Sequence, residues 1–387
     1  MSSFEPKKSF EHIDKLCYEI GPRLSGTERS RKAAEYIKDQ FEEYGFETEF
    51  QEFDFVDKVS KIRAKLAVMA GAFVASLFLS PRVAVLVFVG ALGLYYFLPK
   101  VMPSDKERNV IGSLNPEGEI ERSMVIGAHY DTAQCSKGRE WAYYFKIFPI
   151  LTGAILIFLI LRLFVLGDPL WLVVWTALAV PYLFTCVLPF WLYGDLVSPG
   201  ANDNASGVSV LLEVARVLSE SPPEATEIRV VAFGGEEQGL KGSERFAEQS
   251  EEPDFLLNID SVGSGDRLCL IKGNGIFRRR KTAPDFNEEL GKKMESNGIW
   301  APFSGHDHIP FVKRGIRATT LSSRKLLGGS KFDRFLERFF RLPPVQTLRH
   351  PDIHTLEDVP EKIKLENIRG TGNIILDFIG IEKENND

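Results

Sequence analysis

Two strongly apolar blocks constrain this chain most, because each interrupts a sequence of otherwise soluble character. The first block, residues 64–98, is divided at Pro81 into halves of about 16 or 17 residues, near the shortest length that spans a hydrocarbon core of roughly 30 Å. The second block, residues 145–193, is divided at Asp168 into halves long enough to span. Because the blocks have almost no polar face, they predict four transmembrane helices in two hairpins. For the first block, the alternative is a buried core hairpin.

Strand and helix patterns alternate on both sides of each block, as expected for an α/β domain. Because this alternation resumes after each block, we expect one α/β domain with a mixed, mainly parallel sheet sandwiched by helices and two inserted transmembrane helical hairpins. The discontinuous domain comprises residues 1–56, 106–142 and 196–387, and the hairpins comprise 57–105 and 143–195. The predicted helices are 27–44, 205–219 and 362–381, and the predicted strands are 46–55, 109–114, 123–131, 228–233, 255–263, 267–273 and 316–323.

Basic residues are unevenly distributed around the two hairpins. Both hairpins return to the side from which they enter, and their far turns offer only Arg82 and Arg162. Because basic residues favour the cytoplasmic side, this asymmetry predicts a multi-pass protein of the cell membrane with its soluble domain in the cytoplasm. The basic residues of the near side are Lys58, Lys61, Arg63, Lys65, Lys100, Lys106, Arg108, Lys137, Arg139 and Lys146.

Composition narrows the classes of partner. A formal net charge of -6, with no nucleic-acid motif, argues against nucleic acid. The four cysteines lack CxxC spacing, which argues against a disulfide framework and a structural zinc site. The apolar blocks make a lipid bilayer the expected partner, but they contain too few polar residues to line a transport path. The sequence leaves the oligomeric state open.

Five short motifs follow predicted strands or lie in loops, and each contains His, Asp or Glu. In FGGEE, residues 233–237, two glycines allow a sharp turn at the end of a strand. The adjacent side chains of Glu236 and Glu237 diverge there, so one can bind a metal while the other transfers protons. One acidic turn alone is usually solvated surface charge, and only the set gives a strong signal. The other motifs are GAHYDT (127–132), PGANDNASG (199–207), NIDSVG (258–263) and IHTLED (353–358).

In this order, the motifs resemble those of the zinc aminopeptidases of peptidase family M28. The resemblance covers nearly all of the sequence outside the apolar blocks, from GPRLSGTERSRKAAEYI (21–37) to HTLEDVPEKI (354–363). It implies a fold of the zinc-exopeptidase type and a site for two zinc ions (Zn²⁺) per chain. Such a site needs one shared carboxylate and terminal His and carboxylate ligands on each side.

The resemblance also implies a role for each matching residue. Asp203 would bridge the ions, with His129 and Glu237 completing one zinc site and Asp260 and His354 the other. The division of these terminal ligands between the ions stays open. Two further residues have implied catalytic roles. Asp131 would orient His129 through its ring N–H, and Glu236 would be the general base acting on the zinc-activated water.

The sequence departs from the family pattern in three places. The spacing from His129 to Asp203 is longer than usual, because the second apolar block lies between them. HTLED replaces the commoner HTPxD. SGHDHIPF resembles the family's S-D-H loop, where Asp307 and His308 are expected to support the site without being ligands, and His306 is additional.

The complete ligand set and Glu236 predict a membrane-bound zinc exopeptidase that removes N-terminal residues from peptides, including hydrophobic ones. Glutaminyl cyclase and carboxypeptidase activities on the same fold are the alternatives. An inactive membrane receptor or scaffold with a peptidase fold is a third alternative, which the intact Glu236 disfavours.

The segment KFDRFLERFFRL, residues 331–342, has an amphipathic pattern. Arginines lie away from its apolar face, so a helix here could lie at the lipid interface, cover the site as a lid, or pack in the core. The sequence does not decide between these three interpretations. The apolar face consists of Phe332, Phe335, Leu336, Phe339 and Phe340.

Overall fold

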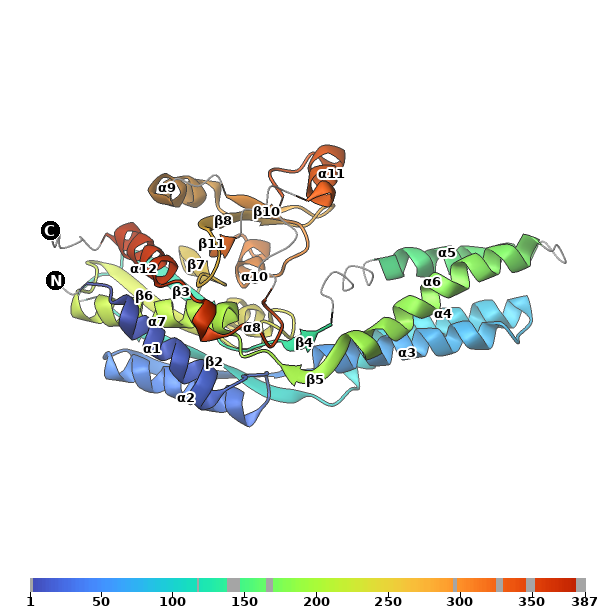
Figure 1. Cartoon of the computed structure of the whole chain (residues 1–387), viewed down its shortest axis with the longest axis horizontal. Helices are drawn as coiled ribbons and strands as arrows, with labels where there is room; N and C mark the ends of the chain where they lie inside the picture. The colour runs from blue at the N-terminus through green and yellow to red at the C-terminus, as the bar shows by residue number, and fades with distance from the viewer. Residues whose placement is uncertain are drawn as a thin grey trace. The chain divides into compact units, whose positions relative to one another are not determined.

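The computed structural model of the chain has two compact units. Most of its elements are labelled in Figure 1. The first unit comprises Met1–Phe55, Lys106–Ala133 and Val197–Asp387, and the second comprises Val56–Asp105 and Gln134–Leu196. The structure describes residues 3–116, 118–137, 147–164, 170–294, 298–324, 330–345 and 352–380.

A nine-stranded sheet forms the centre of the first unit, in the order β1-β2-β6-β3-β7-β11-β8-β10, with β9 paired to β8. The four central strands β6, β3, β7 and β11 are parallel, whereas β2 and β8 pair antiparallel with their central neighbours. The expected mixed, mainly parallel α/β sheet is confirmed. The strands are β1 (Glu47–Phe55), β2 (Asp105–Leu114), β3 (Arg122–His129), β6 (Thr226–Phe233), β7 (Phe255–Ile259), β8 (Arg267–Asn274), β9 (Arg280–Lys281), β10 (Ile299–Ala301) and β11 (Arg317–Arg324).

Helices cover both faces of this sheet because the side chains of its central strands alternate between two apolar clusters. In β3, Ile126 belongs to the cluster with helix α7, while Val125 belongs to the cluster with Phe246 of α8 and Phe311 of α10. The N-terminal helix α1 was not predicted. The helices of this unit are α1 (Pro6–Asp14), α2 (Glu28–Glu43), α7 (Ser206–Glu220), α8 (Lys241–Gln249), α9 (Pro284–Met294), α10 (His308–Lys313), α11 (Lys331–Phe340) and α12 (Leu365–Ile379).

The register of the parallel strands brings three motifs to one edge of the sheet. His129 at the end of β3 pairs with Phe233 at the end of β6. Asp260 follows the last residue of β7, and its N–H donates to the carbonyl of Leu321 in β11 at 3.0 Å. Polar residues that follow neighbouring parallel strands therefore converge, as they do at the ligand sites of open α/β sheets.

Among its described residues, the second unit contains four α-helices and a two-stranded sheet. Two segments, Pro81–Lys100 and Val173–Leu192, are long and apolar enough to cross a membrane, whereas Phe148–Leu161 is shorter. The structure thus gives two candidate spans among the described residues, where the sequence predicted four. The second hairpin's predicted turn at Asp168 lies outside the described residues. The elements are α3 (Lys58–Ser76), α4 (Pro81–Phe97), α5 (Phe148–Leu161), α6 (Leu170–Leu192), β4 (Gln134–Ser136) and β5 (Tyr193–Val197).

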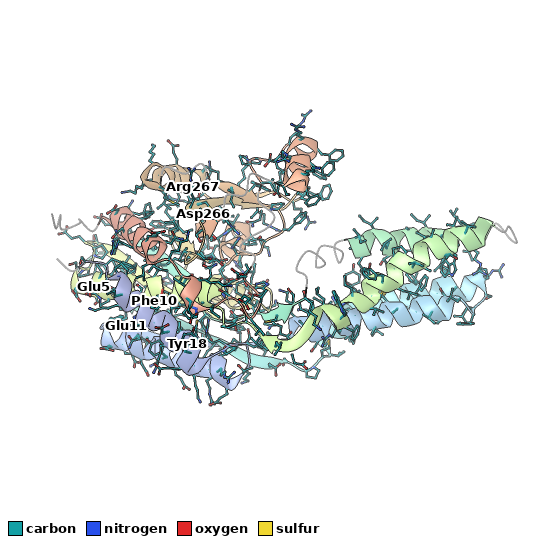
Figure 2. All side chains as sticks on the ribbon, in the orientation of Figure 1. Glu5, Phe10, Glu11, Tyr18, Asp266 and Arg267 are labelled. Atoms are coloured by element: carbon teal, nitrogen blue, oxygen red, sulfur yellow. The ribbon has the colours of Figure 1, made fainter. Side chains whose placement is uncertain are left out.

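The helices of the second unit carry many apolar side chains on their outer surfaces, and side chains project around each of them in Figure 2. Phe78 of the turn after α3 is 83% exposed, and Leu86 of α4 is 71% exposed. Ile150 of α5 and Val180 of α6 are also largely exposed. This much apolar surface is unusual for a protein surrounded by water.

Candidate metal centre

All five expected ligands meet at the carboxyl edge of the central sheet. His129 ends β3, Asp260 follows β7, and Glu237 lies in the loop after β6. Asp203 belongs to the turn before α7, and His354 lies in the loop before α12. The five therefore come from separate segments of the first unit.

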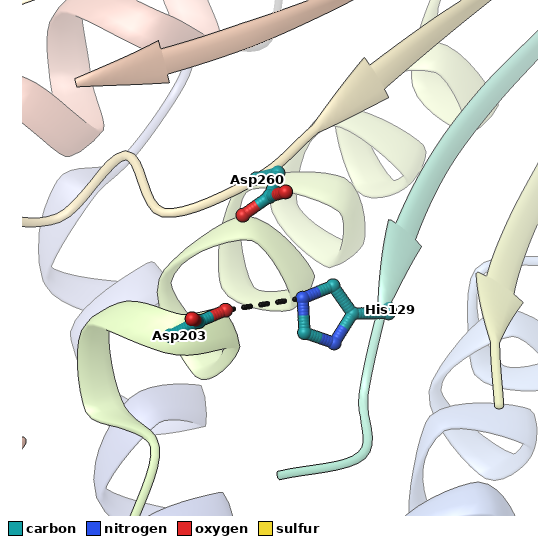
Figure 3. Close-up of side chains that lie close together, drawn as sticks. All are labelled: His129, Asp203 and Asp260. Carbon is teal, nitrogen blue, oxygen red and sulfur yellow. Dashed lines mark ion pairs between the residues drawn. The ribbon is translucent and has the colours of Figure 1, made fainter. Parts of the chain in front are cut away.

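Asp203 and two neighbours form the first potential metal-binding group (Figure 3). One oxygen of Asp203, Oδ1, lies 3.1 Å from Nε2 of His129. Asp260 supplies the third ligand atom, and all three atoms lie within 4.8 Å of one another. All three side chains are buried.

The second group uses the other oxygen of Asp203. Nε2 of His354 lies 3.3 Å from Oδ2 of Asp203 and 2.8 Å from Oε1 of Glu237. These three ligand atoms also lie within 4.8 Å of one another. Asp203 is therefore common to both groups, as a bridging carboxylate would be.

The two potential metal-binding groups combine the expected terminal ligands differently from the assignment that the resemblance implies. His129 groups with Asp260, and Glu237 groups with His354. The reason lies in the sheet order, because β3 and β7 are adjacent and bring His129 and Asp260 to the same side of Asp203. The residue types and motifs contained no information on this strand order.

The donor geometry around His129 suits a cation. Nδ1 of the ring lies 3.1 Å from the carbonyl oxygen of Asp131, which can only accept, so Nδ1 carries the hydrogen. In the neutral ring, Nε2 then directs a lone pair at the carboxylate oxygen of Asp203. Two such acceptors face each other favourably only when a proton or a metal ion lies between them.

The pKa values of the two histidines and of Glu236 also indicate that positive charge stabilises this cluster of carboxylates. Burial alone would lower the pKa of both histidines, but Asp131 and Asp203 raise that of His129 well above its usual value. Glu237 and Asp203 similarly raise the pKa of His354 to about 9. Burial and the neighbouring Glu237 raise the pKa of Glu236 well above its usual range. The residues present thus fit divalent cations, which would neutralise several buried carboxylates at once.

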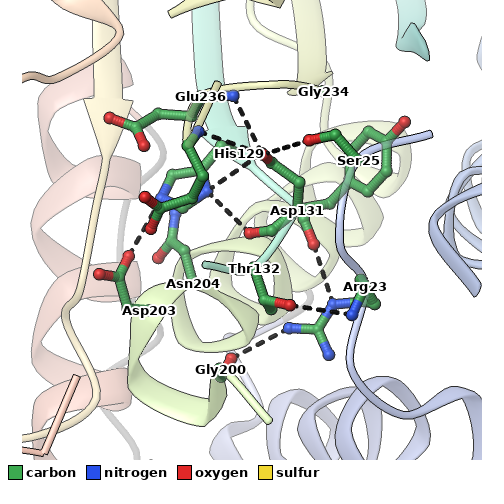
Figure 4. A network of polar contacts seen from close by, with 12 residues as sticks. Arg23, Ser25, His129, Asp131, Thr132, Gly200, Asp203, Asn204, Gly234 and Glu236 are labelled. Atoms are coloured by element: carbon green, nitrogen blue, oxygen red, sulfur yellow. Dashed lines mark hydrogen bonds and ion pairs between the residues drawn. The ribbon is translucent and has the colours of Figure 1, made fainter. Parts of the chain in front are cut away.

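The carboxylate of Asp131 accepts several hydrogen bonds (Figure 4). Its Oδ1 accepts the backbone N–H of Glu236 at 3.0 Å and lies 3.5 Å from Nδ1 of His129. Its Oδ2 accepts the backbone N–H of Glu237 at 3.1 Å and the hydroxyl of Ser25 at 2.8 Å. Asp131 therefore fixes the acidic turn as well as contacting the histidine ring.

Glu236 belongs to neither potential metal-binding group. Its side chain is half-buried, and its Oε1 would lie 3.7 Å from a Cβ added to Gly305. The adjacent Glu237 instead contributes Oε1 to the second group. The two carboxylates thus have different surroundings despite their adjacent positions.

Arg23 was missed as a supporting residue, although GPRLSG was recognised as part of the resemblance. Its guanidinium is fully buried and donates to the carbonyls of Leu16, Tyr130, Pro199 and Gly200 at 2.9–3.1 Å. Arg23 therefore ties the loop after β3 to the loop that carries Asp203 (Figure 4).

Asp358, the last residue of HTLED, is a second residue that was missed. Its carboxylate accepts the backbone N–H groups of Asn202 at 2.8 Å and Asp203 at 3.1 Å. Burial raises the pKa of Asp358 to about 6, in spite of these hydrogen bonds. Its position in the motif was a signal, but only the structure shows which backbone it holds.

The two asparagines of NDNASG shape the turn. Oδ1 of Asn204 accepts the N–H of Gly207, in the first turn of α7, at 3.1 Å and that of Ser261 at 3.0 Å. Oδ1 of Asn202 accepts the N–H of Ser264 at 2.8 Å. These bonds join the Asp203 turn to the loop that follows Asp260.

His308 supports a neighbouring loop through both ring nitrogens. The amide nitrogen of Asn274 donates to two carbonyls, so its Oδ1 must accept from Nε2 of His308 at 2.7 Å. Nδ1 of the neutral ring then accepts the hydroxyl of Thr320 at 2.6 Å. His308 is thus occupied by structural contacts with Asn274 and Thr320.

The two residues before His308 are fully buried, and both interact with residues of the first potential metal-binding group. Nδ1 of His306 lies 2.5 Å from Oδ2 of Asp260. Burial raises the pKa of Asp307 to about 7. The additional histidine of this loop therefore contacts an expected ligand directly.

Comparisons with known proteins agree with this geometry. Residues 186–379, half of the chain, match the model of peptidase family M28. Aminopeptidase YwaD of Bacillus subtilis is 31% identical over 185 residues, which cover 46% of this chain and 36% of that protein. A probable zinc metalloprotease of Pyrenophora tritici-repentis is 47% identical over 76 residues, or 18% of this chain and 16% of that protein. The chain thus aligns with only about a third or less of the length of these relatives.

Solved structures share the fold. A zinc aminopeptidase from Bacillus subtilis superposes with a TM-score of 0.57 at 18% identity, covering 96% of this chain and 93% of that one. A glutaminyl cyclase from Bacteroides thetaiotaomicron superposes with a TM-score of 0.59 at 17% identity, covering 99% of both chains. Structural likeness at this identity reports the fold alone. The matched segment includes Asp203, Glu237, Asp260 and His354, and this match over half of the sequence shows that the chain belongs to peptidase family M28.

Proposed function

We propose that this chain is a membrane-bound, zinc-dependent exopeptidase that removes N-terminal residues from peptides with two zinc ions per chain. The observation that carries this proposal is the position of Asp203, whose two oxygens face different histidines. Oδ1 lies 3.1 Å from Nε2 of His129, and Oδ2 lies 3.3 Å from Nε2 of His354. A carboxylate in this position can serve two ions at once.

The chain would hold one ion with His129, Asp203 and Asp260 and the other with Asp203, Glu237 and His354. Zinc bound there would supply Lewis acidity toward the peptide carbonyl and would lower the pKa of water. Asp131 keeps the histidine and the acidic turn in place through its contacts with His129 and both backbone N–H groups of the turn.

Glu236 would act as the general base. Its carboxylate lies outside both groups but beside them, so it is free to accept a proton from the attacking water. The same carboxyl group can then deliver the proton to the departing amine nitrogen. Two adjacent glutamates thereby divide ligation from proton transfer.

The exposed apolar surface of the second unit supports the membrane part of the proposal. Lipid would cover side chains such as Phe78 and Leu86, which are 83% and 71% exposed. The hairpins would anchor the chain in the cell membrane, with the peptidase unit in the cytoplasm, where it could act on hydrophobic peptides. Protease added to right-side-out and inverted vesicles tests the orientation, since cleavage of the peptidase unit only in right-side-out vesicles would contradict it.

Metal analysis combined with hydrolysis of an aminoacyl amide tests the mechanism in the full chain. The Glu236→Gln variant should retain two zinc ions per chain and lose about 10²–10⁴-fold in kcat. Glu244→Gln, which alters an exposed carboxylate of α8, is the matched control and should retain wild-type activity.

Three outcomes would replace the proposal with an alternative. One zinc per chain together with cyclisation of N-terminal glutaminyl peptides would indicate a glutaminyl cyclase. Release of C-terminal residues would indicate a carboxypeptidase. A zinc-loaded wild-type chain without hydrolytic activity on any peptide would favour the receptor or scaffold.

A further inference from the structure

Helix α11 has one buried side and one exposed aromatic side. Leu336 is 2% exposed and belongs to a small cluster with Trp300. In contrast, Phe335 is 50% exposed and Phe339 is 69% exposed. The helix is therefore attached to its unit by one side and presents phenylalanine rings on the other, which excludes a simple core helix.

The exposed rings form a continuous surface. Phe335 stacks on Phe332 at a centroid distance of 6.4 Å and on Phe339 at 5.3 Å. Phe277, which is 87% exposed, meets the half-buried Phe340 edge-on at a centroid distance of 5.6 Å. We call these five rings the aromatic face. Such a row of exposed rings is a contiguous apolar patch of the kind that marks a binding surface.

Basic side chains accompany the aromatic face. The segments 276–281 and 331–342 together contain eight basic and two acidic residues, in a chain whose formal net charge is -6. The guanidinium of Arg279 donates to the carbonyl of Phe340 and joins the two segments. All but one of the basic residues are exposed, and Arg280 is half-buried. They are Arg278, Arg279, Arg280, Lys281, Lys331, Arg334, Arg338 and Arg341.

We infer that the aromatic face and its basic residues bind the anionic surface of a phospholipid bilayer. Phenylalanine rings partition into the boundary between headgroups and acyl chains, while lysine and arginine are attracted to anionic headgroups. A second copy of this chain is disfavoured as the occupant, because a symmetric contact would bring two strongly basic surfaces together. This inference does not depend on the two-metal mechanism.

The test measures hydrogen exchange of the full chain reconstituted in two kinds of vesicle. One contains phosphatidylcholine alone, and the other contains phosphatidylcholine and phosphatidylglycerol at about 7:3. We expect exchange in α11 to slow at least about tenfold in the anionic vesicles, and high salt should reverse this change. The double variant Phe335→Ser/Phe339→Ser and the single variant Arg338→Glu should each reduce the protection.

Leu365→Ser is the matched control, because Leu365 is an apolar residue of α12 that is 40% exposed. It should leave the protection of α11 unchanged. Exchange in α4 and α6 is followed in the same experiment and reports hairpin insertion separately from the aromatic face. Equal protection of α11 in both vesicles would overturn the inference. Protection that requires a peptide substrate, or that rises with protein concentration, would overturn it in favour of a lid or a self-contact.

Discussion

Replacing Asp131 with asparagine should damage the site although the new side chain has the same shape. In the native protein, Oδ1 accepts the N–H of Glu236 and Oδ2 accepts the N–H of Glu237. An asparagine amide has one oxygen and one NH₂ group, so in either orientation a donor faces one of these N–H groups. The hydroxyl of Ser25 can rotate to accept from the NH₂ group, but a backbone N–H cannot.

The cost follows from these contacts. One buried N–H without an acceptor costs about 1–3 kcal/mol. The remaining hydrogen bond changes from a charged to a neutral acceptor, which costs about 1 kcal/mol more. The turn that carries Glu236 and Glu237 is therefore destabilised by about 3 kcal/mol in total. Where the turn must hold its geometry in the transition state, this corresponds to a loss of about 10²-fold in kcat/KM.

The assay compares hydrolysis of an aminoacyl amide with the zinc content of the same samples. Asp131→Asn should lose about 10²-fold in kcat/KM while most of its zinc remains bound. Ser25→Ala is a milder control, because Oδ2 of Asp131 still accepts the N–H of Glu237 in this variant. Its kcat/KM should fall by no more than about tenfold. The reasoning is refuted if zinc-loaded Asp131→Asn stays within about threefold of the wild type, or if Ser25→Ala is equally damaging.

Three further predictions test other parts of the first unit. Burial lowers the pKa of His12 from 6.5 to about 4. Because the unfolded chain therefore binds more protons than the folded chain, about 2 kcal/mol of stability should be lost as the pH falls from 8 to 5. Urea unfolding of His12→Gln at the same two pH values should show a smaller loss. Gly200 has a φ of +65°, and a Cβ added there would lie 2.6 Å from the carbonyl oxygen of Asp203. Gly200→Ala should therefore lower the free energy of unfolding in urea by about 3 kcal/mol. Gly45 also has a positive φ but open space around it, so Gly45→Ala should lower this free energy by only about 1 kcal/mol. His306 contacts an expected ligand, so His306→Gln should weaken zinc binding about 10–100-fold in equilibrium titrations, and an unchanged isotherm would contradict that role.

The elements and the residue types of the site could be predicted because both are local properties of the sequence. Apolar periodicity placed β6 and α7, and the motifs named five side chains that the structure brings together. The division of the ligands required the strand order, in which β3 lies between β6 and β7. No local pattern in the three segments specifies which strand lies in the middle.

Supporting residues were harder to predict for a related reason. Arg23 and Asp358 hold carbonyl and N–H groups of loops that are distant in sequence. A buried arginine or aspartate in a loop has the same residue type as an exposed one, so hydropathy does not separate them. The one signal of a supporting role was that Arg23 and Asp358 each lie inside a recognised motif.

The number of membrane spans stays a prediction. Four apolar halves predicted four spans, but only Pro81–Lys100 and Val173–Leu192 meet the length and hydropathy needed among the described residues. α3 begins with a basic turn that includes Lys58 and Lys61, and this shortens its apolar part. Short apolar helices can also pack against longer neighbours, so hydropathy alone does not fix the number of spans.

The long insertion between His129 and Asp203 is compatible with a precise site because its two ends are fastened to each other within the first unit. The N–H of Ser198 donates to the carbonyl of Ala133 at 3.0 Å. Arg23 adds hydrogen bonds to carbonyls on both sides of the insertion, at 2.9 Å to Tyr130 and 3.0 Å to Gly200. Loop-closure entropy grows only slowly with length, so once the ends are held, the number of residues between them has little effect on the ligands. The spacing that departs most from the family pattern can thus change without displacing either of the two expected ligands.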